Sequence, residues 1–356
     1  MKTKSLYIHI PFCRSRCPYC AFYTQRIRGS AADGCTERIV RELEAETRKY
    51  NTIYIGGGTP TCLPPEKLRG ILCAAAKCKS ASCEFTVEAN PTDVTPVTAN
   101  LFADSGVNRV SLGVQSALAA ERRALGRRGS IEDIEAAVAE LHGAGITNLS
   151  FDVMVGIPGQ TEASLNETLQ WCVAQDPAHI SAYLLEIYPG TQFAKHSPAL
   201  LPDEEAQAAL YLQMCAFFET NGYMQYEVSN FCRLGFESRH NLTYWNAEEY
   251  MAYGPSAHGF TAGRRWHNTE DLTAWRREED GLGGGFEEYA MLRLRLAEGL
   301  REDLCYTVFG HGIPDKMREA AHPLAELGLA IVMPGSIRLT REGFLLSNSV
   351  IGKLLS

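Results

Sequence analysis

Three cysteines stand close together near the start of this 356-residue chain, as Cys13, Cys17 and Cys20. The chain's other cysteines are scattered, which is typical of small buried side chains. Three thiolates within eight residues allow a single loop to face one metal centre. A structural zinc ion needs four ligands, so it would have to recruit His9 or a distant cysteine. An iron–sulfur cubane usually takes four cysteines as well, so three from one loop would leave one iron open to a small molecule.

A second segment, Ile53 to Pro60, runs from apolar residues into three glycines followed by Thr59. Glycines at the end of a predicted strand let the backbone approach a ligand closely. Because no Gly-Lys-Ser sequence follows, the segment is not a phosphate-binding P-loop. A tight turn before the proline explains the glycines equally well.

Polar residues follow three further predicted strands, as Glu88, Gln115 and Asp152. Parallel barrels place their sites at the carboxyl ends of strands, so we expect these residues, the cysteines and the glycines to share one pocket. Each of them alone is more often a helix-cap or turn residue. Asp152 lies inside an apolar run, where a buried carboxylate needs a partner, and Arg127 is a candidate. A surface ion pair between Arg127 and Glu132 is the alternative.

A third segment, Arg239 to Trp245, places His240 near the large aromatic rings of Tyr244 and Trp245. This combination suits a porphyrin, whose iron takes a histidine and whose faces pack against aromatic rings. The alternative is an amphipathic core segment with a hydrogen-bonded histidine. His258 is a second candidate, although a turn histidine beside glycine explains it better.

The elements that must position these residues alternate along the first half of the chain. The predicted strands are 6–10, 52–55, 84–88, 109–112, 149–154 and 180–185, and the predicted helices are 36–48, 65–76, 96–104, 131–142 and 162–174. Such alternation indicates βα units around a parallel sheet. Because there is no dinucleotide-binding fingerprint, we predict an α/β fold with an incomplete (β/α)6 barrel rather than a doubly wound sheet.

The length exceeds what one ordinary core covers, so we predict a small appendage beside the barrel. The glycine-rich stretch 281–286 is the best linker candidate, and a winged-helix-like α/β domain follows it. We therefore predict a partial barrel over 1–235, a histidine segment with the linker over 236–285, and a C-terminal domain over 286–356.

Composition and charge exclude several classes of protein. The 34 basic and 42 acidic residues give a net charge of −8, which excludes a general nucleic-acid binder. There is no run of 18 or more apolar residues to span a membrane, and the start of the chain lacks the apolar stretch of a signal peptide. We therefore expect a cytoplasmic protein. Peripheral membrane contact and a homodimer stay open.

The cysteine loop resembles the cluster loop of radical S-adenosylmethionine proteins. The motifs Gly-Gly-Gly-Thr-Pro, Val-Glu-Ala-Asn-Pro, Ser-Leu-Gly-Val-Gln-Ser and Phe-Asp-x3-Gly-Ile-Pro-Gly-Gln-Thr resemble the branch that holds oxygen-independent coproporphyrinogen oxidase. That oxidase has a fourth cysteine where this chain has Phe22, and a longer N-terminal segment. The motif His-Asn-x-x-Tyr-Trp at 240–245 is instead similar to the heme-chaperone family of the same branch.

The resemblance implies a role for each of these positions. Cys13, Cys17 and Cys20 would ligate a [4Fe–4S] cluster whose open iron binds S-adenosylmethionine. The contacts to S-adenosylmethionine would come from Tyr7, Gly57, Gly58, Thr59, Glu88, Gln115, Arg127 and Asp152. Heme would be bound by His240, within a motif completed by Asn241, Tyr244 and Trp245.

The resemblance therefore predicts a heme chaperone that transfers heme to an acceptor protein of unknown identity, with an electron donor as a further partner. The alternative is an oxygen-independent coproporphyrinogen oxidase, which decarboxylates coproporphyrinogen to protoporphyrinogen by radical chemistry. Phe22, the short N-terminal segment and the His240 motif favour the chaperone without oxidase activity. The full set of S-adenosylmethionine contacts keeps the enzyme open, because a chaperone has no evident need of them.

Overall fold

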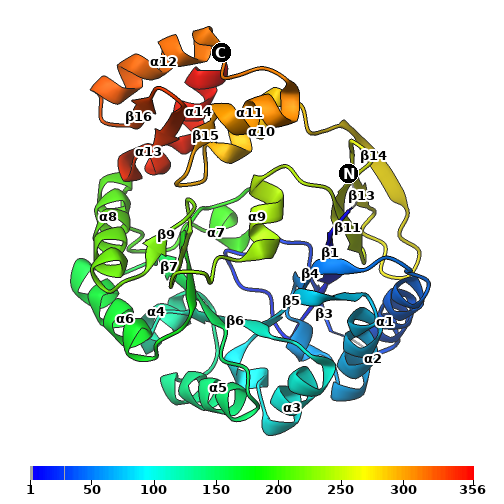
Figure 1. Cartoon of the computed structure of the whole chain (residues 1–356). Helices are drawn as coiled ribbons and strands as arrows, with labels where there is room; N and C mark the ends of the chain where they lie inside the picture. The colour runs from blue at the N-terminus through cyan, green and yellow to red at the C-terminus, as the bar shows by residue number, and fades with distance from the viewer. Residues whose placement is uncertain (1–2, 28) are drawn as a thin grey trace.

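Six parallel strands and the helices between them form the centre of the computed structural model, which describes residues 3–27 and 29–356. The strands are β1 (Ser5–Ile10), β4 (Tyr50–Gly57), β5 (Lys79–Ala89), β6 (Arg109–Gln115), β7 (Leu149–Val155) and β8 (His179–Leu184). The helices are α1 (Gly29–Glu44), α2 (Pro65–Ala76), α3 (Pro96–Ser105), α4 (Ala119–Ala124), α5 (Ile131–Gly143) and α6 (Glu162–Ala174). The strands curve into an open ring with the helices outside, which confirms the predicted incomplete barrel (Figure 1).

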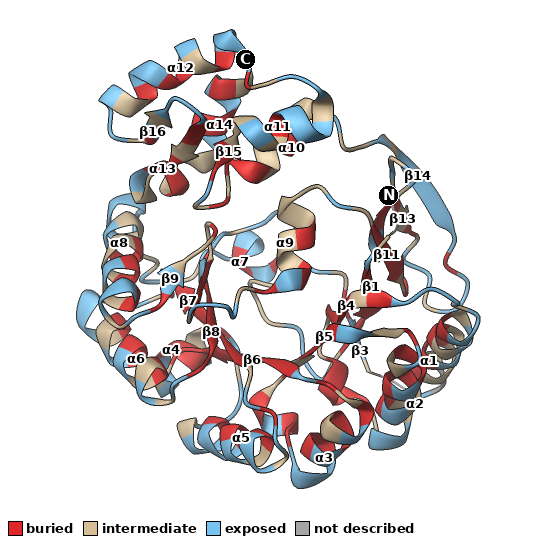
Figure 2. Cartoon of the chain, viewed as in Figure 1, coloured by how far each residue is buried: buried red, intermediate tan, exposed pale blue. Residues whose placement is uncertain are grey.

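Alternation along each strand separates an outer apolar face from an inner polar one. On β1, Leu6, Ile8 and Ile10 are fully buried against the helices, while Tyr7 points to the other side of the sheet. The other parallel strands repeat this pattern, and buried residues concentrate where strands and helices meet (Figure 2). We call the side chains that face the inside of the ring the inner face. The hydrophobic effect thus sets the register, since a slip of one residue would bury the polar set against the helices.

The sheet extends past the six parallel strands at both ends. At one edge lie β10 (Asn230–Cys232) and β9 (Met224–Gln225), preceded by α7 (Gln192–Lys195) and α8 (Glu204–Thr220). At the other edge, after α9 (Arg239–Trp245), β11 (Tyr250–Tyr253) pairs in parallel with β1. The antiparallel strands β12 (His258–Thr261), β13 (Arg264–Asn268) and β14 (Arg277–Leu282) then complete a twelve-stranded open sheet.

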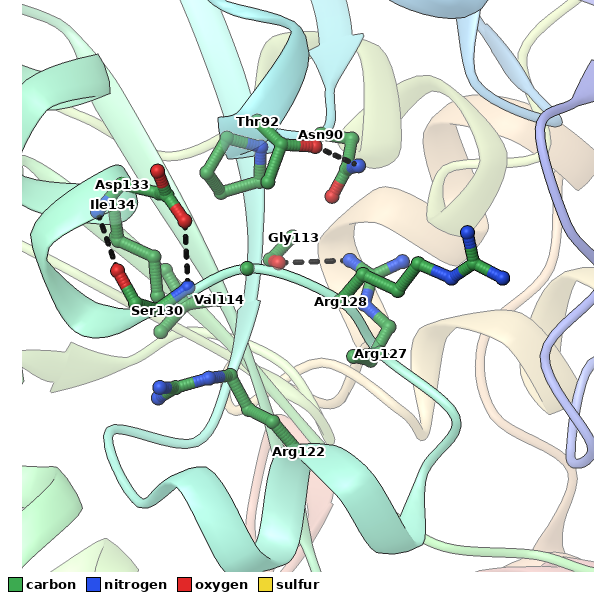
Figure 3. Close-up of a pocket in the computed structure, with 12 residues that line it drawn as sticks. Asn90, Thr92, Gly113, Val114, Arg122, Arg127, Arg128, Ser130, Asp133 and Ile134 are labelled. Atoms are coloured by element: carbon green, nitrogen blue, oxygen red, sulfur yellow. Dashed lines mark hydrogen bonds between the residues drawn. The ribbon is translucent and has the colours of Figure 1, made fainter.

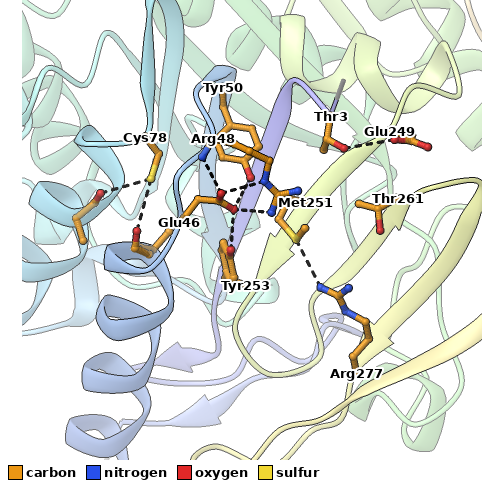
Figure 4. A network of polar contacts seen from close by, with 12 residues as sticks. Thr3, Glu46, Arg48, Tyr50, Cys78, Glu249, Met251, Tyr253, Thr261 and Arg277 are labelled. Atoms are coloured by element: carbon orange, nitrogen blue, oxygen red, sulfur yellow. Dashed lines mark hydrogen bonds and ion pairs between the residues drawn. The ribbon is translucent and has the colours of Figure 1, made fainter. Parts of the chain in front are cut away.

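A buried carboxylate fastens this extension to the barrel. Glu46 follows α1 and accepts hydrogen bonds from Tyr50 Oη (2.7 Å), Tyr253 Oη (2.8 Å) and Arg48 Nη2 (2.6 Å), as Figure 4 shows. Burial alone would raise the pKa of Glu46, but these donors lower it to about 2. One ionised side chain therefore joins the end of a helix to β4 and β11.

The C-terminal part forms a small α/β unit that lies beside the ring (Figure 1). It contains α10 (Phe286–Arg293), α11 (Glu302–Phe309), α12 (Asp315–Glu326), α13 (Arg341–Leu345) and α14 (Ser347–Leu355), with the strands β15 (Leu300–Arg301), β16 (Ala330–Met333) and β17 (Ser336–Leu339). The hairpin of β16 and β17 has the form of a wing, which agrees with the predicted winged-helix-like domain. The domain boundaries at 235 and 285 stay predictions. No helix in the described ranges is long and apolar enough to cross a bilayer.

Candidate functional site

The cysteine loop leaves the carboxyl end of β1 and is fixed at its base by the glycine turn that follows β4. The Thr59 amide donates to the Phe12 carbonyl (2.7 Å) and the Gly58 amide donates to the Ile10 carbonyl (2.8 Å). At the outer side of the loop, the Phe193 amide donates to the Pro18 carbonyl (3.0 Å). These backbone bonds hold the loop in one place without using its cysteine side chains.

The three thiols of this loop are all half-buried, and they lie near one another. Burial raises the pKa of Cys13 to about 11 and also raises that of Cys20, so these thiols are protonated in the metal-free protein. Among the described residues, no three His, Cys, Asp or Glu side chains already stand in a metal-binding arrangement. Cysteine thiolates are nevertheless the donors that iron–sulfur clusters use, and three of them on one anchored loop would leave one iron of a cubane open.

His9 does not complete this set. Its Nδ1 lies 2.9 Å from Tyr7 Oη and its Nε2 lies 3.1 Å from the carbonyl of Tyr23, so both ring nitrogens have partners. Burial lowers the pKa of His9 to about 4, which keeps the ring neutral. The zinc site with His9 as fourth ligand therefore finds no support in this geometry.

The glycine turn owes its composition to close packing within the protein. A Cβ on Gly58 would lie 2.4 Å from the Phe12 carbonyl oxygen, and one on Gly57, whose φ is +108°, would lie 2.4 Å from the His9 ring. Any larger residue would push the cysteine loop away from β4. The tight-turn reading is thus correct, and the turn at the same time brings Thr59 Oγ1 to 3.6 Å from the Cys13 sulfur.

Two carboxylates lie on the inner face at the same end of the barrel. Glu88 accepts hydrogen bonds from Tyr54 Oη (2.8 Å) and from the Gly57 amide (3.1 Å), and Asp152 accepts one from Ser111 Oγ (2.9 Å). Burial and the neighbouring Asp152 raise the pKa of Glu88 to about 7, and burial raises the pKa of Asp152 to about 6. This pair has fewer donors than two ionised carboxylates need, so it is suited to receive a cation.

Arg127 lies between the end of β6 and the cysteine loop. Its Nη2 donates to the Gly113 carbonyl (2.8 Å), as Figure 3 shows, and its Nη1 lies 4.0 Å from the Cys17 sulfur. Among the described residues it makes no ion pair with Glu132, so the surface-pair alternative is wrong. The capping box of Ser130 at the start of α5 fixes the far end of the segment that carries Arg127.

Gln115 ends β6 in a strained backbone conformation. Its φ is 68°, which is uncommon for a residue with a Cβ, and the ladder to β7 shifts register at this point. The side chain is buried at the same end of the barrel as Glu88 and Asp152. Strain that the surrounding structure maintains is frequent at functional sites.

Further polar residues of the inner face were missed by sequence reasoning. They are Thr52, Tyr54, Thr86, Arg109, Ser111, Ser150, His179, Ser181 and Tyr183. Arg109 is 2% exposed, and its Nε has no hydrogen-bond partner among the described residues. The signal that would have found them is a polar residue at every second position of each predicted strand, which marks a strand with one polar face.

His240 lies at the opposite end of the barrel from the cysteines. Its Nδ1 is 2.8 Å from Thr52 Oγ1, near the start of β4, and its backbone amide donates to Glu84 (3.0 Å). Its Nε2 is 2.7 Å from Tyr244 Oη, and its ring stacks on Tyr54 with centroids 5.2 Å apart. The side chain is 1% exposed, and burial lowers its pKa to about 3. Helix α9 thus closes the amino end of the ring, and in this arrangement His240 offers no free nitrogen to a metal.

The remaining residues of the motif complete this closure. The Asn241 amide is capped by Ser238 Oγ (3.3 Å), which begins the helix. The ring of Tyr244 packs edge-on against His240 and Tyr250. Trp245 ends the helix half-buried. The structure therefore brings the cysteines, the glycine turn, Glu88, Gln115, Arg127 and Asp152 together at one end and places the histidine motif at the other.

Comparison with known proteins places this geometry in a class. Residues 7–172 match the model of the Radical SAM superfamily. The fold is similar to that of the coproporphyrinogen III oxidase HemN from Escherichia coli, a radical SAM enzyme, with a TM-score of 0.83 and 21% identity over 99% of this chain and 90% of that one. Such a low identity shows the fold alone. Residues 7–172 thus form a radical SAM domain, and this superfamily implies a [4Fe–4S] cluster and S-adenosylmethionine.

Similarity to two curated proteins is closer. The chain is 34% identical over 375 residues to a protein named Heme chaperone HemW from Bacillus subtilis, and the alignment covers 99% of both chains. It is also 34% identical to the Heme chaperone HemW of Lactococcus lactis, over 99% of this chain and 98% of that protein. The chain belongs to the HemW family of heme chaperones.

Proposed function

We propose that this protein binds heme as its cargo and passes it to an acceptor protein, with a [4Fe–4S] cluster and S-adenosylmethionine as resident cofactors. The observation that carries the proposal is the similarity to HemW proteins along 99% of the chain. The likeness to HemN extends to the fold alone. The absence of a fourth cysteine at Phe22 supports the same choice.

Cys13, Cys17 and Cys20 would hold the cluster, because they are the thiols of one loop whose backbone is anchored independently of them. The cluster would supply an open iron for the amino and carboxylate groups of S-adenosylmethionine, and electrons from a donor protein. The remaining contacts to S-adenosylmethionine would come from Tyr7, Gly57, Gly58, Thr59, Glu88, Gln115, Arg127 and Asp152.

The carboxylate pair supports this assignment physically. S-adenosylmethionine carries a sulfonium, whose positive charge would stabilise the ionised forms of Glu88 and Asp152 beyond what Arg109 provides. Arg127, beside Cys17 at the mouth of the barrel, is suited to pair with the carboxylate that the iron would also hold. The charges of the site and of the molecule are therefore complementary.

Heme binding through His240 requires a change of conformation. Both ring nitrogens would have to give up their hydrogen bonds to Thr52 and Tyr244, and the side chain would have to leave the inner face. In our proposal the closed conformation keeps His240 away from heme, and His240 binds the heme iron only after α9 has moved. Such an equilibrium lowers the apparent affinity for heme by the fraction of molecules in the open state.

The experiment that tests the function is a paired anaerobic assay on protein with a reconstituted cluster. One half titrates heme by its Soret absorbance and then follows transfer to an acceptor apoprotein. The other half incubates reduced protein with coproporphyrinogen and S-adenosylmethionine and measures protoporphyrinogen. We expect heme binding and no decarboxylation. Decarboxylation with multiple turnovers would overturn the chaperone in favour of the oxidase.

A further inference from the structure

A cluster of histidines and carboxylates lies outside the site described above, on the exposed face of the strands β12, β13 and β14. His258 and His267 are cross-strand partners whose rings stack with centroids 5.4 Å apart. Asp280 Oδ1 is 2.7 Å from His267 Nδ1, and Asp280 Oδ2 is 4.0 Å from His258 Nδ1. Glu278 Oε2 lies 3.7 Å from His267 Nε2. Two imidazoles thus share one carboxylate, with a second carboxylate beside them.

His258, His267 and Asp280 line a hollow of about 500 Å³. Its walls are Ser256, His258, His267, Thr269, Glu270 and Asp280. The hollow lies beside the cysteine loop, because Tyr23 Oη donates to the Glu270 carbonyl. All six lining residues are polar and two of them are acidic, so the hollow suits a hydrated cation better than an apolar or anionic molecule.

An irregularity in the pairing of β13 with β14 directs the carboxylate of Asp280 towards the two histidines. Arg265 pairs with Gly281 and Trp266 pairs with Glu279, so Asp280 has no partner across the ladder. This is a β-bulge, a device that redirects a side chain and often accompanies a site. At the start of β14, the guanidinium of Arg277 packs 3.7 Å over the Trp266 ring of β13, which holds the hairpin together. The three side chains are therefore presented by ordered strands.

We propose that His258, His267 and Asp280 bind a divalent first-row transition-metal ion, with Glu278 or water completing the shell. Two histidines and one carboxylate with open positions are a recurrent donor set for iron(II) and zinc. Asp280 at present directs Oδ1 to His267 Nδ1 (2.7 Å) and Oδ2 to His258 Nδ1 (4.0 Å), so among the described residues the three side chains do not yet converge on one ion. Rotation of the half-exposed Asp280 and the exposed His258 brings the set together.

The test uses cobalt(II) as the probe, titrated anaerobically into protein whose cluster has been reconstituted. We expect one ion per chain with d–d bands and no thiolate-to-cobalt charge transfer, which separates this site from the cysteine loop. His258→Ala and Asp280→Asn should each weaken binding at least about tenfold, as loss of a ligand or of its orienting partner does. His142→Ala removes an exposed histidine of α5 and should leave the titration unchanged.

Three results would overturn the proposal. They are the absence of cobalt binding, binding that survives both variants, and thiolate charge-transfer bands that account for all of the bound metal. A fourth would replace it: loss of the heme Soret titration in His258→Ala with no cobalt site in the unsubstituted protein would assign the hollow to heme. The proposal does not depend on the chaperone function, so the two can fail separately.

Discussion

Two half-buried glutamates in this molecule have opposite hydrogen-bonding environments. Glu46, at the junction of α1, β4 and β11, receives hydrogen bonds from Arg48, Tyr50 and Tyr253, and its pKa falls to about 2. Glu88, on the inner face, has a tyrosine and one amide as donors and Asp152 as a neighbour, and its pKa rises to about 7. The carboxylate of Glu46 thus has a full set of hydrogen-bond donors within the chain, whereas that of Glu88 does not.

The difference separates a structural carboxylate from a binding one. Stability alone favours an apolar pair or a full set of donors over two adjacent carboxylates in a buried place. In our proposal, Glu88 and Asp152 are together because they bind a ligand that brings positive charge. This is the physical reason to place the cationic part of S-adenosylmethionine at this end of the barrel rather than at the Glu46 junction.

The largest effect should be on ligand binding. Glu88→Gln removes the charge and keeps the shape, and we expect the affinity of the cluster-loaded protein for S-adenosylmethionine to fall about 100-fold. Equilibrium dialysis with labelled ligand measures it. The matched control is Glu46→Gln, which should bind normally once folded. Equal losses in the two variants would remove the distinction between the two regions.

The next largest effect should be on stability. At pH 8, one variant should lower the free energy of unfolding and the other should raise it. Glu46→Gln loses charge-assisted hydrogen bonds and should lower the free energy of unfolding by about 2 kcal/mol. Glu88→Gln removes a charge that burial opposes and should raise it. Denaturant titration of both variants checks this. Destabilisation of both by similar amounts would contradict the account.

The pH dependence follows from the same two groups. Since folding raises the pKa of Glu88 from 4.5 to about 7, its ionisation costs stability progressively as the pH rises through that window. The advantage of Glu88→Gln should therefore be small at pH 5 and larger at pH 8. Folding lowers the pKa of Glu46, so its contribution is complete above pH 4.5 and is lost as the pH falls towards 2. Melting temperatures across pH 5 to 8 should show a slope in the Glu88 variant and none in the Glu46 variant relative to the unsubstituted protein.

The smallest expected effect concerns the release of His240. Thr52→Val and Tyr244→Phe each remove one hydrogen bond from the imidazole and nearly preserve its packing. If the closed position of α9 keeps His240 away from heme, losing one hydrogen bond should make opening easier. Each variant should then raise the apparent heme affinity about fivefold, which corresponds to the free energy of one hydrogen bond. His240→Ala should abolish binding and leave the cluster chromophore intact. Heme titrations that do not change in any of the three variants would exclude His240 as the ligand.

Much of the fold could be predicted from the sequence because its strands are strongly apolar on one face. All six parallel strands lie where the pattern places them, although α1 spans Gly29–Glu44 rather than 36–48. The extension by β11 could not be predicted in this way. It pairs with β1 across more than 200 residues, and its four residues carry no periodicity of their own. Pairing between distant short segments depends on tertiary packing, which local patterns do not encode.

For the candidate site, we expected residues at the carboxyl ends of parallel strands to lie together, although they are far apart in sequence. Glu88, Gln115 and Asp152 do lie at the same end of the barrel as the cysteine loop. The rule could not reveal that Arg109 and His179 line the same inner face, because they stand at the beginnings of strands. It also gave no position for α9, whose contacts with Thr52 and Glu84 arise from the closure of the ring.

We expect Glu88 to be partly protonated at pH 7 in the ligand-free protein and to lose this proton when a cation binds. Calorimetric titration of S-adenosylmethionine into cluster-loaded protein at pH 7, in buffers of different ionisation enthalpy, counts that proton directly. With a pKa of about 7, Glu88 should release roughly half a proton for each molecule bound, and the Glu88→Gln variant should release less. Binding without proton release, or equal release from the Glu88→Gln variant, would contradict the account.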